Sequence, residues 1–199
     1  MTQSWLPQYF TDVLSVELKD VGIFAVMPYL AGVVFDNVWA VLIDHLIARG
    51  TLSTLGARKF SQVVAFAAPS LCIGVLLGLG ERVTPVLASA LFSAALGINM
   101  ASHSGYWANL IDISPTKAGF ALGVSNTIGN IPGTVCLKNS ALVGVHVVSP
   151  YLAGIYGNIL TGFVLASSGS WFAVFGIAIA HWVVGLGIYT AWASAEEIF

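Results

Sequence analysis

The sequence predicts an all-α protein, a polytopic bundle of helices that crosses a membrane several times. Of the 199 residues, 57% are hydrophobic and only 8% are charged, and the mean hydropathy is +0.89. The charged residues are confined to short gaps between uncharged apolar stretches at 60–80, 83–111, 118–137 and 139–195. A helix rises about 1.5 Å per residue and the hydrocarbon core of a bilayer is about 30 Å thick, so each stretch is long enough to cross.

We expect about five complete spans, separated by short polar turns. Proline and glycine inside these spans are tolerated, because neighbouring helices satisfy the backbone groups that they release. The charges and the proline of the segment DISPTK end the third span. The expected spans cover 21–47, about 60–80, about 85–110, about 118–137 and 171–194.

The basic residues predict the orientation in the membrane. Arg49, Arg58 and Lys59 lie in the gap 48–59, and Lys117 follows the third span. Cytoplasmic loops carry the excess of Lys and Arg, so we expect both loops inside. Alternation of the spans then places the N-terminus outside and the C-terminus inside. The sequence does not indicate which membrane holds the protein.

Several other functions are disfavoured by the composition. The net charge is −2 and the seven basic residues are dispersed, so nucleic acid is not an expected partner. Cys72 and Cys136 lie in apolar runs without CxxC spacing, which indicates small core residues. The four histidines are scattered and HExxH is absent, so we expect neither a metal site nor a cofactor.

The stretch 105–133 carries a specific motif. It resembles the segment N-x-x-D-I-x-P-x-x-A-G-x-x-x-G-x-S-N that joins the tenth and eleventh helices in the anion:cation symporter branch of the major facilitator superfamily. That branch includes sialin, vesicular glutamate transporters, type I sodium/phosphate cotransporters and plastid phosphate transporters. The matching residues are Asn109, Asp112, Ile113, Pro115, Ala118, Gly119, Gly123, Ser125 and Asn126.

Three more segments resemble the same branch in the expected order. They are WLPQYF at 5–10, D-x-L-x-x-R-G-x-L-S-T followed by RK at 44–59, and A-S-x-E at 193–196. The resemblance implies that 1–199 is a partial transporter domain, running from the end of helix seven to helix twelve. It corresponds to the C-terminal six-helix half of a twelve-helix carrier.

The chain departs from the family pattern in two places. Trp39 and Ala40 stand where the family usually has a pair of glycines, which puts close helix packing there in doubt. The stretch 118–170 is also longer than one helix and a turn require. We therefore expect an insertion at 137–160, where Lys138 and Pro150 interrupt the apolar run.

The resemblance implies transport of a small inorganic or organic anion, coupled to a proton or sodium gradient. Such carriers bind substrate between two halves, so the expected partners are the anion, the coupling ion, the lipid bilayer, and either an N-terminal half or a second copy. Phosphate, glutamate and sialate all remain open as substrates. The alternative is a truncated membrane protein that does not transport.

Four residues near the loop 48–59 are candidates for gating. Asp44 resembles the acid of the family's loop motif, which stabilises one conformation of the carrier. Arg49, Arg58 and Lys59 complete this set. Asp36 lies inside the first span, where a carboxylate costs about 2.5–3.5 kcal/mol and therefore faces a cavity or a partner. It is either a coupling site or a helix-packing group.

The third span carries a run of polar residues. At 3.6 residues per turn, Asn99, Ser102, Tyr106 and Asn109 share a face, which either lines a substrate pathway or packs against another helix. His103 is offset from Ser102 by about 100 degrees and suits either proton coupling or an interhelical hydrogen bond. Asn126 on the fourth span is a further candidate, either for the pathway or for helix packing.

An intramembrane hydrolase is a remote alternative. Ser102, Ser104, His103 and Asp112 supply the residue types of a catalytic triad. The motif G-x-S-x-G is absent, however, and adjacent residues on a helix point in different directions. We therefore expect that the protein is not an enzyme.

Overall fold

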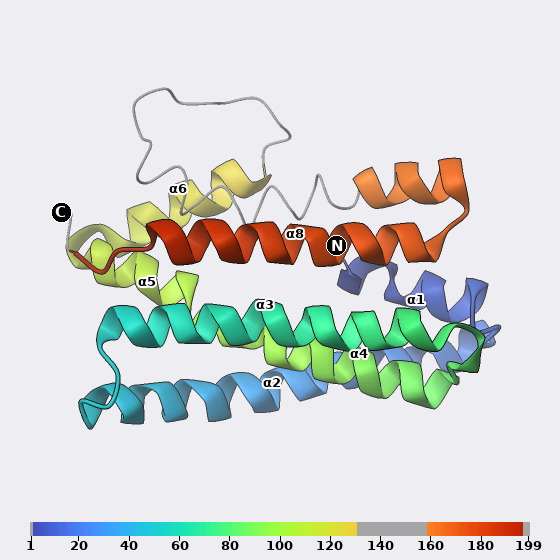
Figure 1. Ribbon diagram of the computed structural model, residues 1–199, viewed down its shortest axis with the longest axis horizontal. Coiled ribbons are helices and arrows are strands. Elements are labelled where there is room, and N and C mark those ends of the chain that lie inside the picture. The colour runs from blue at the N-terminus through green and yellow to red at the C-terminus, as the bar shows by residue number, and fades with distance from the viewer. Residues whose placement is uncertain (1, 131–158, 197–199) are drawn as a thin grey trace.

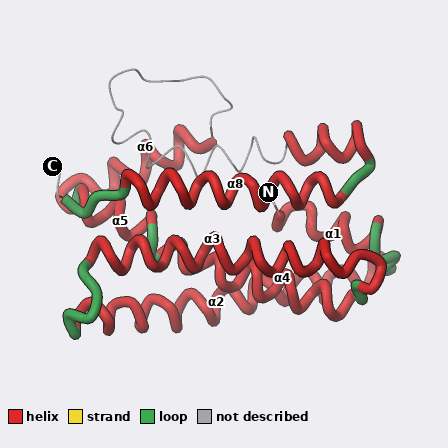
Figure 2. The backbone as a smooth tube through the Cα atoms, viewed as in Figure 1, coloured by secondary structure: helices red, strands yellow, loops and turns green. Residues whose placement is uncertain are grey.

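A computed structural model describes residues 2–130 and 159–196, and their regular secondary structure is helical (Figures 1 and 2). Within this part of the chain, four segments are long and apolar enough to cross a membrane. They are α2 (Leu18–Ala48), α3 (Thr54–Leu79) with the 3-10 turn η1 (Gly80–Arg82), the segment Pro85–Ile113, and α8 (Trp171–Trp192). The prediction of an all-α membrane bundle is confirmed.

Hydroxyl side chains define where three of these helices begin. Ser53 precedes α3, and its Oγ accepts a hydrogen bond from the N–H of Gly56 at 3.1 Å. Thr84 caps α4 (Pro85–Asn99) in the same way, and Ser170 caps α8. The first N–H groups of a helix have no intrahelical acceptor, so each cap stabilises its helix by about 1 kcal/mol.

The third span is present as expected at about 85–110, but it is not one regular α-helix. It consists of α4, the 3-10 helix η2 (Met100–His103) and α5 (Tyr106–Ile113). Gly105 separates η2 from α5 with φ −89° and ψ −110°, which is not a helical conformation. The regular spacing of 3.6 residues per turn therefore does not hold across the polar run, and its side chains do not form one continuous helical face.

The bundle is held together by close contacts between α2, α3, α4 and α8. Helix α4 packs against both α2 and α3, and α8 packs against α3. A Cβ atom added at Gly97 would lie 3.3 Å from the Cβ of Ala31, and one at Gly32 would lie 3.3 Å from Cγ of Met100. Small residues at these points let the backbones of α2 and of the third span approach closely, as in other membrane helix pairs.

Helix α1 (Thr2–Asp12) packs against α2 and α8 and supplies aromatic residues to the core. The ring of Tyr9 lies edge-on to Phe92, Trp171 and Phe175, with centroids 5.1–5.5 Å apart. Phe10 and Phe92 are completely buried. Edge-on aromatic pairs add about 0.5–1.5 kcal/mol to the energy of burial. This cluster joins α1, α4 and α8 at one end of the bundle.

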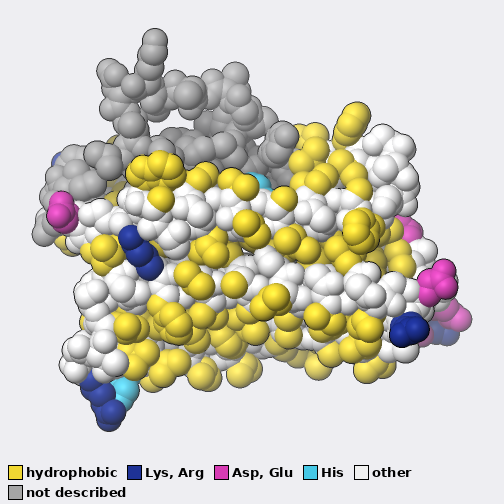
Figure 3. All heavy atoms as spheres, in the orientation of Figure 1, with side chains coloured by type: hydrophobic (Ala, Val, Ile, Leu, Met, Phe, Trp, Pro, Cys, Tyr) yellow, Lys and Arg dark blue, Asp and Glu magenta, His cyan; other side chains and the backbone are white. Residues whose placement is uncertain are grey.

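Charged side chains on the visible face gather at the two ends of the molecule, and apolar side chains cover its flanks (Figure 3). The loop between α2 and α3, helix α5 and the last turn of α8 lie at one end, and the turns after α3 and before α8 lie at the other (Figure 1). This arrangement agrees with the order of loops expected from the basic residues. Several valines of α2 are about two-thirds exposed, including Val34, Val38 and Val41, as expected for a surface in contact with lipid.

Two shorter helices complete the described chain. Helix α6 (Ala118–Asn130) forms the start of the expected fourth span, and a ten-residue apolar helix covers Ile159–Ser168. A Cβ atom at Gly162 would lie 3.5 Å from the ring of Trp5, so the second helix packs against α1. The rest of the expected span 118–137 and nearly all of the expected insertion at 137–160 lie outside the described residues.

Candidate functional site

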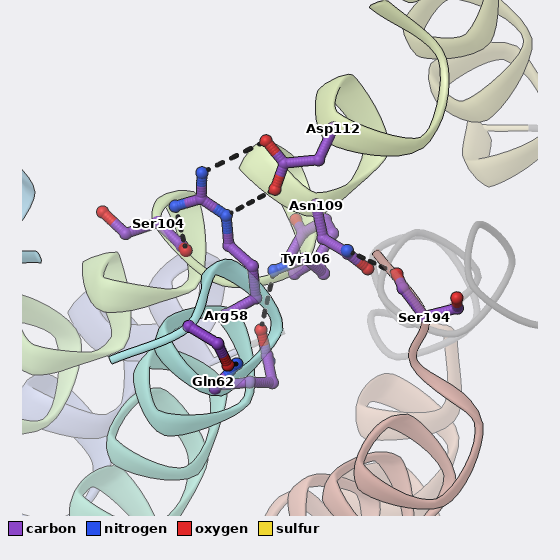
Figure 4. Close-up of polar contacts among 9 residues, drawn as sticks. Arg58, Gln62, Ser104, Tyr106, Asn109, Asp112 and Ser194 are labelled. Atoms are coloured by element: carbon purple, nitrogen blue, oxygen red, sulfur yellow. Dashed lines mark hydrogen bonds and ion pairs between the residues drawn. The ribbon is translucent and has the colours of Figure 1, made fainter. Parts of the chain in front are cut away.

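Arg58 and Asp112 form the main polar contact at the end of the bundle that carries the loop 48–59. Arg58 lies in the second turn of α3, and Asp112 lies in the last turn of α5. The Nε atom of Arg58 is 2.7 Å from Oδ2 of Asp112, and Nη2 is 3.3 Å from Oδ1 (Figure 4). The side chains are only 11% and 23% exposed. Such a two-pronged ion pair fixes both distance and orientation.

The same guanidinium also holds the backbone between η2 and α5. Its Nη1 donates to the carbonyl of Ser104 at 3.2 Å. One turn further along α3, Oε1 of Gln62 accepts a hydrogen bond from the N–H of Tyr106 at 3.2 Å. Tyr106 begins α5, so this N–H has no acceptor within its own helix. Side chains of α3 therefore hold the break in the third span.

Gly105 allows α3 and α5 to approach each other at this point. A Cβ atom at position 105 would lie 2.5 Å from Oε1 of Gln62 and 3.2 Å from its backbone nitrogen. Any other residue would displace the Gln62 side chain from Tyr106. Glycine at this position is thus a requirement of the junction.

Asn109 adds a third segment to the junction. It is 2% exposed, and its Nδ2 donates to the carbonyl of Ser194, just beyond α8, at 2.8 Å (Figure 4). Together with Arg58, Gln62 and Asp112, it forms what we call the junction cluster, which joins α3, α5 and the end of α8. Its members come from α3 and α5 and bind a carbonyl beyond α8, so the cluster resists the separation of all three segments at this end of the bundle.

A second polar pair joins α2 to η2. The Nδ1 atom of His103 lies 3.1 Å from Oδ1 and 3.0 Å from Oδ2 of Asp36. The two side chains are 49% and 35% exposed. Asp36 lies in the middle third of α2 (Leu18–Ala48), and His103 lies in the middle third of the segment Pro85–Ile113. The pair is thus away from the ends of both candidate membrane spans.

The other polar residues expected to line a pathway have separate surroundings. Asn99 donates from Nδ2 to the carbonyl of Ala65 at 2.8 Å, which joins α4 to α3. Ser102 is buried, and the half-buried ring of Tyr106 lies 5.6 Å from that of Trp107. Asn126 lies on α6, and its side chain is outside the described residues.

Of the four gating candidates, the structure places Arg58 alone in an ion pair among the residues it describes. Asp44 and Arg49 are exposed, and Lys59 is half-buried. These three lie at the same end of the bundle as the junction cluster. Their side chains are thus at the surface of the bundle at this end.

The four residues considered for a catalytic triad do not contact one another as a triad would require. His103 contacts Asp36, whereas Asp112 binds Arg58. Ser104 takes part through its backbone carbonyl. The described geometry does not support this alternative.

Sequence reasoning did not single out Gln62 or Ser61, and it named Ser194 only as part of the segment A-S-x-E. Gln62 and Ser61 are polar residues inside an apolar run, and that signal is enough to suggest interhelical bonds. Ser61 accepts a hydrogen bond from Nε1 of Trp39 at 3.2 Å, and the indole stacks on Phe60 with centroids 5.7 Å apart. Trp39 thus packs against α3 at the position where the related family usually has glycine.

The fold and these contacts define a multi-pass membrane helix bundle whose spans are joined by polar side chains. The chain is homologous to plant anion transporters. It is 30% identical over 98% of its length to the rice protein "Probable anion transporter 4, chloroplastic" and covers 29% of that protein. It is 32% identical to the "Ascorbate transporter, chloroplastic" of Arabidopsis thaliana, again over 98% of its own length and 31% of the relative.

The same pattern holds for the Arabidopsis "Sodium-dependent phosphate transport protein 1, chloroplastic". The identity is 29% over 98% of the chain and 33% of that relative. The chain therefore spans about a third of the length of these three relatives. No protein-family profile matches the chain.

Proposed function

We propose that the chain is the C-terminal part of an anion:cation symporter of the major facilitator superfamily. In a larger carrier it takes part in moving a small inorganic or organic anion, driven by a proton or sodium gradient. The observation that carries this proposal is the extent of the similarity. Nearly all of the chain aligns with about a third of proteins named as anion, ascorbate and phosphate transporters.

Within such a carrier, we assign the junction cluster a gating role. Carriers of this kind rock one half against the other around a central site, so the contacts at each end differ between the two orientations. Arg58 and Asp112 fix α3 to α5 at the end that carries the basic loop. Asp44, Arg49 and Lys59, exposed or half-buried at that end, are available to the opposing half when that end is closed.

Reconstitution into liposomes tests the proposal. The 199-residue chain alone should take up no phosphate or ascorbate above empty vesicles, because one half provides only one wall of the site. Co-reconstitution with the N-terminal part of the rice relative should produce uptake under an imposed gradient. Separate proton and sodium gradients identify the coupling ion.

The outcomes separate the competing functions. Strong uptake by the chain alone would indicate a carrier made of two copies. No uptake in either preparation, from correctly folded protein, would support a truncated membrane protein that does not transport. Hydrolysis has no support from the described geometry, and the relatives are named as transporters.

A further inference from the structure

The Asp36–His103 pair is unusual because it is ionisable, lies away from the ends of its two spans, and is open to its surroundings. The side chains are 35% and 49% exposed. A charged group in hydrocarbon near the middle of a span costs about 2.5–3.5 kcal/mol. The part of α2 and η2 that carries the pair therefore faces water or another protein segment rather than lipid.

Few other charges of the described residues lie near this pair. On α2, Lys19 and Asp20 lie at one end, Asp44 and His45 lie at the other, and Tyr29 lies two turns before Asp36. On the third span, α4 has no ionisable side chain, and α5 contributes Tyr106 and Asp112.

Helix α3 contributes Arg58, which binds Asp112, and Lys59. Helix α8 contributes His181 and Tyr189. Among the described residues, His103 is the one basic side chain away from the span ends that lies within hydrogen-bond distance of a carboxylate. The guanidinium of Arg58 is already neutralised by its own partner.

We propose that Asp36 and His103 form a proton-linked binding site for one anion. This inference rests on the proposed transport function and names the group that couples the two ions. With a proton on the imidazole, the carboxylate of Asp36 neutralises His103 and the pair has no net charge. One further proton, taken up by Asp36, breaks the ion pair and leaves the imidazolium free to hold a monoanion.

The two ring nitrogens of His103 have separate roles in this exchange. The Nδ1 atom of His103 faces both carboxylate oxygens of Asp36, which leaves Nε2 on the opposite side of the ring. The loaded site contains one added proton and one added negative charge, so it again has no net charge. Release of the anion returns the proton from Asp36, and nothing else is consumed.

Linkage makes the proposal quantitative. If the proton and the anion bind together, each raises the affinity for the other by the same factor. The apparent dissociation constant of a monoanion should then rise about tenfold for each unit of pH, over the range in which Asp36 is ionised in the free pair. For an anion site without this linkage, the apparent dissociation constant does not change in this way with pH.

Proton uptake by the whole chain in lipid nanodiscs tests this mechanism. Sodium ascorbate, a monoanion, is added in weak buffer at about pH 5.5, where a free imidazole is largely protonated and a free Asp carboxyl largely ionised. The wild type should take up about one proton per ascorbate bound. Asp36→Asn should bind ascorbate with almost no proton uptake. His103→Gln should neither bind ascorbate nor take up protons.

Two matched variants control for the loss of charge. Asp20→Asn removes an acid from the same helix near its end, and His181→Gln removes an exposed histidine from α8. Both should behave as the wild type. Spectra of ¹⁵N-labelled histidine provide a second readout: the ring signal lost in His103→Gln should be the one that moves when ascorbate is added.

Proton uptake that is absent from the wild type, or equal in Asp36→Asn and the wild type, would overturn the proposal. So would an unchanged His103 ring signal at saturating ascorbate. These measurements do not require transport. A failure of the carrier to take up anions in liposomes would therefore contradict the proposed function while leaving the linkage between proton and anion measurable.

Discussion

Arg58 and Asp112 lie 54 positions apart in the sequence, yet they form a two-pronged ion pair that ties the start of α3 to the end of α5. The guanidinium also binds the carbonyl of Ser104. One side chain thus stabilises the break in the third span and the contact between two spans. The strength of the junction cluster depends on its geometry as well as on its charge.

Replacing Arg58 should weaken the bundle in a graded way. Arg58→Ala removes hydrogen bonds to a partly buried carboxylate, and we expect the free energy of unfolding to fall by about 1.5–3 kcal/mol. Arg58→Lys keeps the charge but not the two-pronged geometry, so its loss should be smaller. Unfolding in mixed detergent micelles measures both.

A double-mutant cycle separates the ion pair from other effects of Arg58. Once Asp112→Asn is present, Arg58→Ala should cost clearly less than it does in the wild type. Equal costs in the two backgrounds would show that the pair contributes nothing to stability.

Gly105→Ala should destabilise the junction. The added methyl group would lie 2.5 Å from Oε1 of Gln62 and close to the backbone of α3, and overpacking of this kind costs about 1–3 kcal/mol. Gly74→Ala is the matched control, because a Cβ atom at that position of α3 meets nothing within 4 Å. It should be neutral or slightly stabilising, since alanine favours helix. Equal melting temperatures for the two variants would contradict this role of Gly105.

The sequence was sufficient to predict the helical class and the ends of most spans. In a bilayer, an uncharged run of about 20 residues is almost always a spanning helix. The start of α3 was predicted less well, because this helix begins at Thr54, inside the polar loop expected at 48–59. The spacing of basic residues also predicted which loops share an end. These features depend on local composition, which can be read from a single sequence.

The contacts between spans were harder to predict. Periodicity assumed a regular helix through Asn99 and Asn109, whereas Gly105 interrupts it because α3 approaches closely there. Asp36 and His103 were each singled out, but their contact depends on how α2 packs against η2. Pairing across 67 positions is decided by tertiary packing, and periodicity within one helix does not contain that information.

Deleting 137–160 should leave the protein able to insert and fold. Lys138 and Pro150 interrupt the apolar run in this segment, and the family resemblance is complete without it. We expect expression in the membrane at or above the level of the full chain, measured by fluorescence-detected size-exclusion chromatography. Aggregation of the shortened chain would show that the segment is an integral part of the fold.

The last prediction concerns orientation. Thr51 lies in the loop after α2, and Ser167 lies near the end of the helix Ile159–Ser168, where both are exposed. Each is replaced by Cys in a background in which Cys72 and Cys136 are Ala. The basic loop should remain inside, because Arg49, Arg58 and Lys59 oppose its translocation. A membrane-impermeant thiol reagent added to intact cells should therefore label position 167 and leave position 51 unlabelled until the cells are opened. Labelling of both positions from outside would rule out this topology, and labelling of position 51 alone would show that it is inverted.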